Sequence, residues 1–226
     1  MIYKYETHLH TFEASACAVN SGEQMAELYS SKGYAGIFVT DHFFNGNSCI
    51  PRDLDWAERV KQFCFGYENA KAAGEKLGLD VFFGFEWNYH AMEFLVYGLD
   101  KDFLLANPNC DKLKPAKFAS LVHQAGGFIS QAHPFREAPY IQKQMQYPEL
   151  SDAAEVINMG NRSADMNRKA LEYAEKYSLA KTAGSDIHST DRFCGGGMAF
   201  DHRLTGPRDF MDCVRAGNCE LLGDFI

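Results

Sequence analysis

Long apolar runs and a basic surplus are both missing from this chain of 226 residues, and each absence argues against a class of protein. No stretch approaches the length of an apolar membrane span, so no membrane-embedded part is expected. Lys and Arg number 22 against 30 Asp and Glu, and the formal net charge of −8 argues against a stable complex with nucleic acid. The first residues do not resemble a signal peptide, and we therefore expect a cytoplasmic protein.

Paired cysteines and a phosphate-binding glycine loop are also missing. The seven cysteines are odd in number and contain no C-x-x-C pair, which predicts free thiols in a reducing compartment. No Lys-Ser or Lys-Thr pair follows the glycines at 195–197, so this run predicts a flexible turn. The sequence therefore indicates neither a disulfide scaffold nor a nucleotide-binding loop of that kind.

The composition is that of a folded domain. Hydrophobic residues make up 46% of the chain and aromatic residues 14%, which excludes a disordered protein. The length is typical of one large domain, and no linker, repeat or low-complexity tract divides it, so residues 1–226 are expected to form a single domain. The abundant Tyr and Phe are expected to pack in the core.

Short apolar runs alternate with segments of helical period. Helices are expected after a capping box at Ser21, over 54–77 as the longest, over 118–125, and around 166–174. Strands are expected at 2–7, 35–40, 80–85, 93–97, 127–131, 153–157, 180–184 and 197–200. This alternation predicts a parallel α/β sheet covered by helices. Because ligand-type residues follow nearly every strand, we expect a closed β/α barrel with its site at the C-terminal ends of the strands.

Histidines and acids stand at those strand ends. They are His8, His10, His42, Glu86, His133, Asp186 and His188. Residues two apart on an extended chain point the same way, so each His-x-His or Asp-x-His pair can reach one cation. Each residue also has an ordinary explanation when it is taken singly. The paired histidines can be surface residues, His42 can be a loop residue, and Glu86 can form an ion pair. Asp41 is expected to support a neighbouring histidine. Five fragments in equivalent places together predict a multinuclear metal site.

The spaced set resembles the PHP family, named for polymerase and histidinol phosphatase domains. The motifs are His-x-His near the start, Thr-Asp-His at 40–42, Gly-x-Glu at 84–86, Ala-His-Pro at 132–134 and Gly-Ser-Asp-x-His at 184–188. The resemblance covers nearly the whole chain. It implies a distorted (β/α)7 TIM-like barrel with two or three divalent ions, commonly zinc, manganese or iron.

The resemblance also implies how the ligands are divided. His8, His10, Glu86 and Asp186 would hold one ion, Glu86 would bridge to a second ion that takes His133, and His42 and His188 would serve a third. Two further ligands of the family pattern are missing from their usual places. Ala16 stands near the place of the first missing ligand, and Glu13 and Cys17 are the possible substitutes. For the second, Glu93 is preferred to His90 because it directly precedes a strand.

The resemblance implies metal-dependent hydrolysis of a phosphate ester, with Glu86, Asp186 and His188 as the residues closest to the chemistry. Three arginines in predicted rim loops, Arg136, Arg162 and Arg192, are candidates for binding a small phosphorylated substrate. Two other functions stay open. One is C–N bond hydrolysis by an amidohydrolase-like enzyme, although such barrels usually need a bridging lysine. The other is a metal-binding regulatory module without activity.

Overall fold

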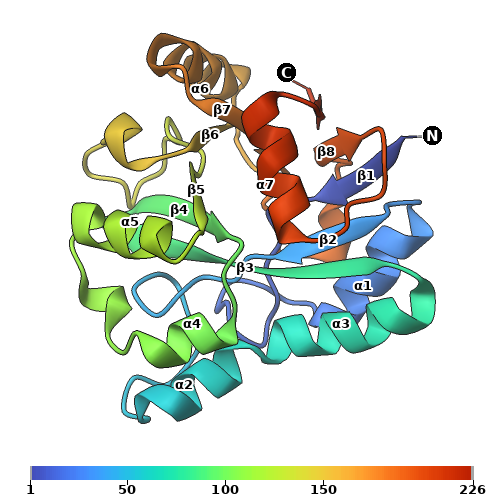
Figure 1. Ribbon diagram of the computed structural model, residues 1–226, viewed down its shortest axis with the longest axis vertical. Helices are drawn as coiled ribbons and strands as arrows, with labels where there is room; N and C mark the ends of the chain where they lie inside the picture. The colour runs from blue at the N-terminus through green and yellow to red at the C-terminus, as the bar shows by residue number, and fades with distance from the viewer. Residues whose placement is uncertain (1, 225–226) are drawn as a thin grey trace.

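Nine strands form one sheet in the computed structural model, which describes residues 2–224 (Figure 1). The order across the sheet is β7-β6-β5-β4-β3-β2-β1-β8-β9. All eight expected strands are present, and β9 was not expected. The strands are β1 (Tyr3–Glu6), β2 (Gly36–Val39), β3 (Asp80–Tyr89), β4 (Met92–Tyr97), β5 (Phe128–Gln131), β6 (Ala153–Asn158), β7 (Ala180–Gly184), β8 (Gly197–Phe200) and β9 (Glu220–Leu222).

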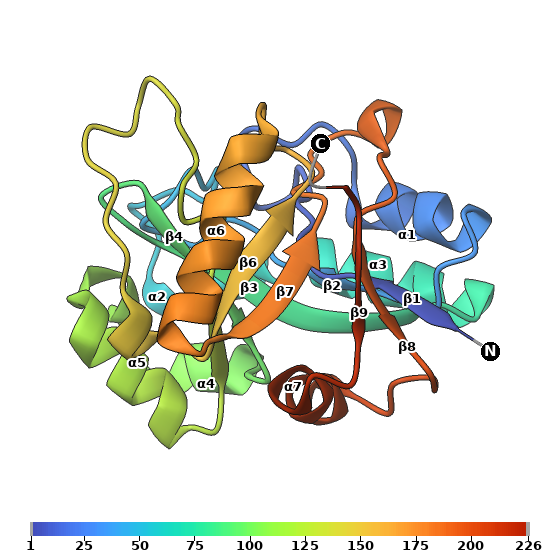
Figure 2. The same ribbon diagram turned by 90° about the horizontal axis from the view of Figure 1, so that it is seen from above.

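The sheet curls into a nearly closed barrel, as expected. The chain just after β1 meets the chain just after β7 through a parallel bridge between Leu9 and Ile187. The N–H of His10 donates to the carbonyl of Ile187 at 3.0 Å, and the Thr7 hydroxyl donates to the carbonyl of Ala183 at 2.6 Å. Residues 3–5 pair instead with β8, so β8 and β9 lie between β1 and β7 at the other end (Figure 2).

The expectation of an all-parallel sheet fails at β4, which is antiparallel to both β3 and β5. A tight turn joins β3 to β4, with His90 and Ala91 both at positive φ (52° and 63°). Such a turn usually carries Gly, Asn or Asp, which this one lacks, so its chemistry was not visible in the sequence. Because β4 starts at the edge where the parallel strands end, Glu93 at its beginning faces the same end of the barrel.

Seven helices are described in residues 2–224: α1 (Gly22–Ser31), α2 (Trp56–Phe63), α3 (Phe65–Leu77), α4 (Lys101–Ala106), α5 (Pro115–Gln124), α6 (Ala164–Tyr177) and α7 (Pro207–Ala216). The capping box at Ser21 is confirmed. The single helix expected over 54–77 is wrong, because the chain breaks at Cys64 into α2 and α3. A Cβ on Gly66, at the start of α3, would lie 2.0 Å from the Thr11 hydroxyl, so α3 packs directly behind the loop after β1. No helix in this part of the chain is long and apolar enough to cross a membrane.

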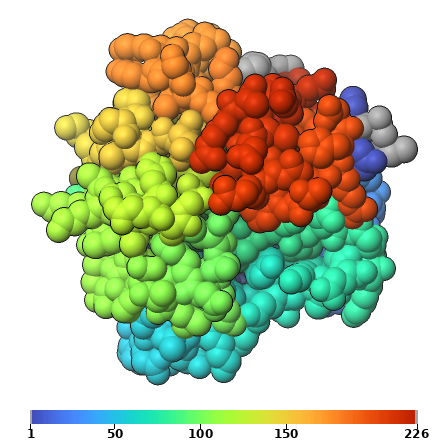
Figure 3. All heavy atoms as spheres, in the orientation of Figure 1, coloured from blue at the N-terminus to red at the C-terminus, as the bar shows by residue number. Residues whose placement is uncertain are grey.

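The barrel is filled by aromatic side chains below the site. Phe38, Tyr97 and Phe128 lie in the same buried cluster as Phe210 of α7. The ring centroids of Phe38 and Phe210 are 4.6 Å apart. The space-filling view shows the C-terminal region, which includes α7, covering the centre of this face (Figure 3). The barrel is therefore a packed core at the end where the parallel strands begin, and its opposite end carries the polar side chains.

Candidate metal centre

The seven predicted ligand residues come together at the C-terminal end of the barrel. Backbone pairing explains part of this convergence, since His42 and Glu86 form a parallel bridge just beyond β2. The ligand atoms fall into overlapping groups of three, each within 4.8 Å of one another: His8–His10–Glu86, His8–His133–Asp186, His42–Glu86–Glu93 and His10–His42–His188. Six of the seven residues are buried, and His188 is partly exposed. Their role as metal ligands remains a prediction that this geometry supports.

Two of these residues hold an unfavourable backbone conformation. His133 has φ of 27° and Asp186 has φ of 54°, a region that costs non-glycine residues about 1–3 kcal/mol. Such strain persists where the surrounding structure fixes it, commonly at functional sites. Gly184 allows the close approach behind Asp186, because a Cβ there would lie 2.5 Å from the Cβ of His8.

His8 and His10 direct their Nε2 atoms to the same point. His8 Nδ1 lies 2.8 Å from Glu155 Oε1 and donates its hydrogen there, so Nε2 is the nitrogen that can bind a metal ion. Ser15 donates to Asp41 Oδ1 at 2.7 Å and therefore accepts from His10 Nδ1 at 3.2 Å. The two Nε2 atoms are 3.1 Å apart. A protonated His8 donates from Nε2 to His10, whereas a metal ion that replaces this proton would be bound by both nitrogens.

Glu86 has the geometry of a bridging carboxylate. Its Oε1 lies 3.2 Å from His8 Nε2 and 3.4 Å from His133 Nε2. Its Oε2 lies 2.6 Å from His42 Nδ1 and 3.8 Å from His10 Nε2. The two oxygens therefore face separate sets of imidazole nitrogens. Burial opposes charge on Glu86, but the positive charge of His42 and His8 outweighs it and holds the pKa of Glu86 well below the ordinary value.

Polar atoms left without hydrogen bonds test whether these residues fit metal ions. Both carboxylate oxygens of Glu86, His42 Nδ1 and His133 Nε2 are buried and lack a hydrogen bond of acceptable geometry. Leaving such atoms unpaired costs about 1–3 kcal/mol each, and more when they are charged. They point at one another rather than at donors. The donor set of imidazole nitrogens and carboxylate oxygens is the one that zinc, iron and manganese accept, so the residues fit divalent ions.

Buried carboxylates are concentrated in and around the centre. Six carboxylates in and around it are at most 9% exposed: Glu6, Asp41, Glu86, Glu93, Glu155 and Asp186. Burial lowers the pKa of His8, yet the carboxylates of Asp186, Glu155 and Glu86 raise it well above the ordinary value. The pKa of His10 is lowered by burial and by His42 and His188, which keeps it in the neutral form that binds metals. Bound cations would balance this charge.

Arg136 is the predicted arginine that reaches the centre. Its Nη1 lies 2.6 Å from Asp186 Oδ2, and its other nitrogens donate to Asn158 Oδ1 at 2.7 Å and Asn161 Oδ1 at 3.1 Å. Asp186 Oδ1 is thereby left to face His10 Nε2 at 3.2 Å and His8 Nε2 at 3.4 Å. Arg136 thus orients a ligand. Arg162 and Arg192 are exposed and do not line the pocket at the centre, so the structure gives no support to their predicted phosphate contacts.

The structure distinguishes between the candidates for the two missing ligands. Glu93 lies 3.4 Å from His133 Nε2, whereas His90 is exposed in the β3–β4 turn. Glu13 accepts hydrogen bonds from Gly22 N at 3.1 Å and Asn69 Nδ2 at 2.9 Å, away from the cluster. We therefore withdraw His90 and Glu13 as ligand candidates and retain Glu93.

Cys17 was the other possible substitute near Ala16. It lines the pocket at the mouth of the centre together with His42 and His188. Burial raises the pKa of its thiol, but interactions with His188 and His42 outweigh burial and lower the pKa to about 6.

Buried polar residues that the sequence did not reveal hold the histidines in place. Glu155 bonds His8 Nδ1 through Oε1 and accepts from His133 N at 3.0 Å through Oε2. Glu6 accepts from the backbone nitrogens of His8 and Ser185, both at 2.9 Å. Glu155 stands inside the apolar strand β6, which was the available signal, because a carboxylate there must be paired. Glu6 ends β1, a strand that also carries Lys4, and gave no such signal. Asp41 supports the histidines as expected, through Ser15.

A pocket of about 590 Å³ opens onto the centre. It is lined by Cys17, His42, Asn45, Gly46, Asn47, Asn88, Ala91, Glu93, His133, Arg136, Tyr140 and His188. Its only cationic side chain among the described residues, apart from the histidines, is Arg136. The pocket is large enough for a small organic ester beside the candidate ligands.

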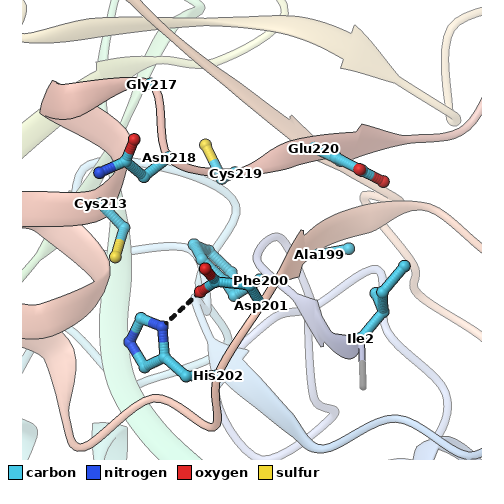
Figure 4. A pocket seen from close by; sticks show the side chains of 10 residues that line it. All are labelled: Ile2, Ala199, Phe200, Asp201, His202, Cys213, Gly217, Asn218, Cys219 and Glu220. Carbon is cyan, nitrogen blue, oxygen red and sulfur yellow. Dashed lines mark hydrogen bonds and ion pairs between the residues drawn. The ribbon is translucent and has the colours of Figure 1, made fainter.

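A second group of ligand-type residues lies outside this centre, at the start of α7 (Figure 4). His202 bonds Asp201 Oδ1 at 2.7 Å and Asp209 Oδ2 at 3.1 Å. Asp209 also accepts from the backbone and hydroxyl of Thr205. Hydrogen bonds that position the start of α7 account for this group without an ion.

Comparison with known proteins links the C-terminal part of the chain to a named family. Residues 165–219 match the PHP-associated family model. An uncharacterized protein of Methanocaldococcus jannaschii is 29% identical over 114 residues, which are 45% of this chain and 48% of that protein. The match thus spans about half the length of this relative.

Solved structures show the same fold at low sequence identity. A two-domain protein from Bacteroides vulgatus, containing a predicted PHP-like metal-dependent phosphoesterase, superposes with a TM-score of 0.73 at 14% identity, over 98% of this chain and 64% of that one. An amidohydrolase from Chromobacterium violaceum, with bound sulfate and no metal, gives 0.53 at 15% identity, over 82% and 88%.

The barrel and its clustered histidines and carboxylates form a candidate metal centre. The match of residues 165–219 to the PHP-associated family model and the likeness of fold agree with the resemblance that the motifs indicated.

Proposed function

We propose that this protein is a metal-dependent phosphoesterase that hydrolyses a small phosphate ester. The observation that carries the proposal is Glu86, whose two buried oxygens face separate groups of histidines. His8, His10, Glu86 and Asp186 would hold one ion, and Glu86 with His133 and Glu93 would hold a second. His42 and His188 would serve a third, and zinc, manganese and iron all suit such ligands.

The bound ions would lower the pKa of a water molecule and neutralise charge on the phosphoryl oxygens. The side chains of the protein would hold the metal ligands in position and exclude water from the site. Glu155 and Ser15 fix the tautomers of His8 and His10, and Arg136 fixes the orientation of Asp186. His188 Nδ1 donates to the Asp186 carbonyl at 2.9 Å, so its ring is held at the mouth of the pocket, next to the place of an incoming ester.

The pocket and the charge favour a small substrate over a polymer. A pocket of about 590 Å³ holds a sugar, nucleotide or amino-alcohol phosphate. A long nucleic acid would need many lysines and arginines near its phosphates, whereas this chain has a formal net charge of −8.

C–N bond hydrolysis is the competing function, and the likeness to the amidohydrolase from Chromobacterium violaceum favours it. The bridging lysine usual in such barrels has no counterpart among the described residues that line this pocket. In our proposal the bridging residue is Glu86. The regulatory alternative predicts lost ligands, but all seven predicted ligands converge.

A substrate screen tests the proposal. The protein is loaded separately with Zn²⁺, Mn²⁺ or Fe²⁺ and assayed on p-nitrophenyl phosphate, bis-p-nitrophenyl phosphate, a panel of phosphorylated metabolites, a panel of amides and single-stranded DNA. We expect turnover of at least one small phosphate ester that chelation abolishes. Turnover of amides or DNA with no activity on any small ester would overturn the proposal.

A further inference from the structure

Asn88 contacts Glu93 in the wall of the pocket at the centre. The two residues are cross-strand partners on β3 and β4, so their side chains point to the same face of the sheet. Asn88 Nδ2 donates to Glu93 Oε1 at 3.1 Å. The other carboxylate oxygen, Oε2, lies 3.4 Å from His133 Nε2, whereas Oε1 lies 3.9 Å from His42 Nδ1. The amide of Asn88 thus occupies one oxygen of Glu93 and leaves free the oxygen that lies nearer to an imidazole.

The orientation of this amide is fixed by its second contact. Asn88 Oδ1 accepts a hydrogen bond from the N–H of Ala91 at 3.3 Å, in the turn between β3 and β4. A flipped amide would present its oxygen to the Glu93 carboxylate and its hydrogens to the Ala91 N–H, so both contacts would become repulsive. Asn88 therefore offers a donor to Glu93 and not an acceptor.

Asn45 holds the backbone of Asn88 in turn. The chain after β2 pairs with β3 at Glu86, whose carbonyl accepts from Phe43 N at 2.8 Å. Two residues further along β3, the side-chain amide of Asn45 continues this pairing. Its Nδ2 donates to the carbonyl of Asn88 at 2.5 Å, and its Oδ1 accepts from the N–H of Asn88 at 3.2 Å. The amide acts here as a backbone peptide group would, so Asn45 ties the loop after β2 to the residue that contacts Glu93.

We propose that Asn88, held by Asn45, is a positioning residue that directs Oε2 of Glu93 to the second ion of the centre. A carboxylate with both oxygens free can rotate or bind an ion through either oxygen, and the hydrogen bond from the amide removes this freedom. Asn88 acts on Glu93 as Arg136 acts on Asp186, but without a charge. Loss of a partner of this kind typically lowers metal affinity by about 10–100-fold. The inference rests on the metal centre of the proposed function and is independent of the substrate.

Manganese titration of isosteric variants tests the inference. Asn88→Asp keeps an oxygen for the Ala91 N–H but turns a second oxygen toward Glu93, so the turn keeps its bond while the support of Glu93 is lost. Asn69→Asp is the matched control, because Asn69 Nδ2 donates to Glu13 Oε1 at 2.9 Å on the exposed surface. The metal-free proteins are titrated with Mn²⁺. Electron paramagnetic resonance measures the free ion at each step and distinguishes a coupled pair of bound ions from a single ion. Circular dichroism verifies that each variant is folded.

We expect one Mn²⁺-binding step to weaken by about 10–100-fold in Asn88→Asp, while the other steps stay as in the wild type. The spectrum of the coupled pair should then appear only at a correspondingly higher Mn²⁺ concentration. Asn45→Asp places a carboxylate against the carbonyl of Asn88 and should weaken the same step, so it provides the test if Asn88→Asp does not fold. Asn69→Asp should bind Mn²⁺ as the wild type does.

Unchanged or tighter binding in a folded Asn88→Asp protein, or an equal loss at every step, would overturn the inference. A wild type that binds fewer than two Mn²⁺ ions would overturn it together with the metal centre. A wild type that binds both ions, and whose Asn88→Asp variant weakens one of them, but that hydrolyses no phosphate ester would contradict the proposed function alone.

Discussion

Replacing Glu86 by glutamine should lower turnover by about a thousandfold or more and reduce the number of bound ions, because the substitution removes metal binding as well as charge stabilisation in the transition state. Glutamine keeps the size of glutamate but offers one oxygen and an N–H₂ group. At this position the two oxygens face His8 and His133 on one side and His42 on the other. The amide nitrogen would point a pair of hydrogens at one of these sets, so the link between two ions would be lost. The measurements are kcat and metal content of the two proteins loaded under the same conditions.

Glu13→Gln is the matched control for this experiment. Glu13 follows the same His-x-His motif, but it accepts hydrogen bonds from Gly22 and Asn69 away from the cluster, and glutamine can still accept one of them. Its kcat and metal content should stay within about twofold of the wild type, as for surface substitutions that change stability by less than about 0.5 kcal/mol. A Glu86→Gln protein with full activity would refute the site as described, provided that its circular dichroism matches the wild type.

Removal of the metal ions should lower the melting temperature by roughly 10 °C. An ion that binds only the folded chain stabilises it by about 4 kcal/mol when its free concentration is 1,000 times its dissociation constant. For a domain of this size, 1 kcal/mol changes the melting temperature by about 2–4 °C. The physical reason is the buried charge, since the metal-free protein must keep Glu86, Glu93 and Asp186 close together without cations.

Scanning calorimetry of chelated and reloaded protein measures this change. Glu86→Gln is a useful comparison here, because a variant that binds fewer ions should show a smaller rise on reloading. Equal melting temperatures for chelated and reloaded wild-type protein would contradict the idea that the cluster is built around ions. A rise of equal size in the wild type and in Glu86→Gln would show that the stabilising ion binds elsewhere.

The barrel-like fold and the meeting of the candidate ligands at one end of it could be predicted from the sequence, but two local features of the fold could not. The candidate ligands stand next to strongly apolar strands. Their two-residue spacing and their position just after predicted strands therefore revealed them. The β3–β4 hairpin was missed because its turn, His90-Ala91, lacks the residues that usually mark positive φ. The break at Cys64 was missed because apolar spacing continues across it, and the need for it is a tertiary contact between Gly66 and Thr11.

The supporting residues show where sequence reasoning reached its limit. Glu155 interrupts the apolar strand β6, and this signal is strong enough to have been used, whereas Glu6 at the end of β1 gave none. By contrast, nothing in the sequence shows that Arg136 would turn inward to Asp186 while Arg162 and Arg192 stay exposed, since all three stand in loops that follow strands. The choice between Glu13 and Cys17 likewise depends on how the loop after β1 folds over the centre.

Counting the ions tests the central claim, that the barrel end is a multinuclear metal centre. Elemental analysis of protein purified without chelators, with the concentration determined by amino-acid analysis, gives the number of ions per chain. Three groups of histidines and carboxylates are linked to one another through Glu86 or His8. Together they offer more ligand atoms than a single four- or five-coordinate ion can bind. The structure predicts at least two tightly bound divalent transition-metal ions per chain, and a value below one would contradict it.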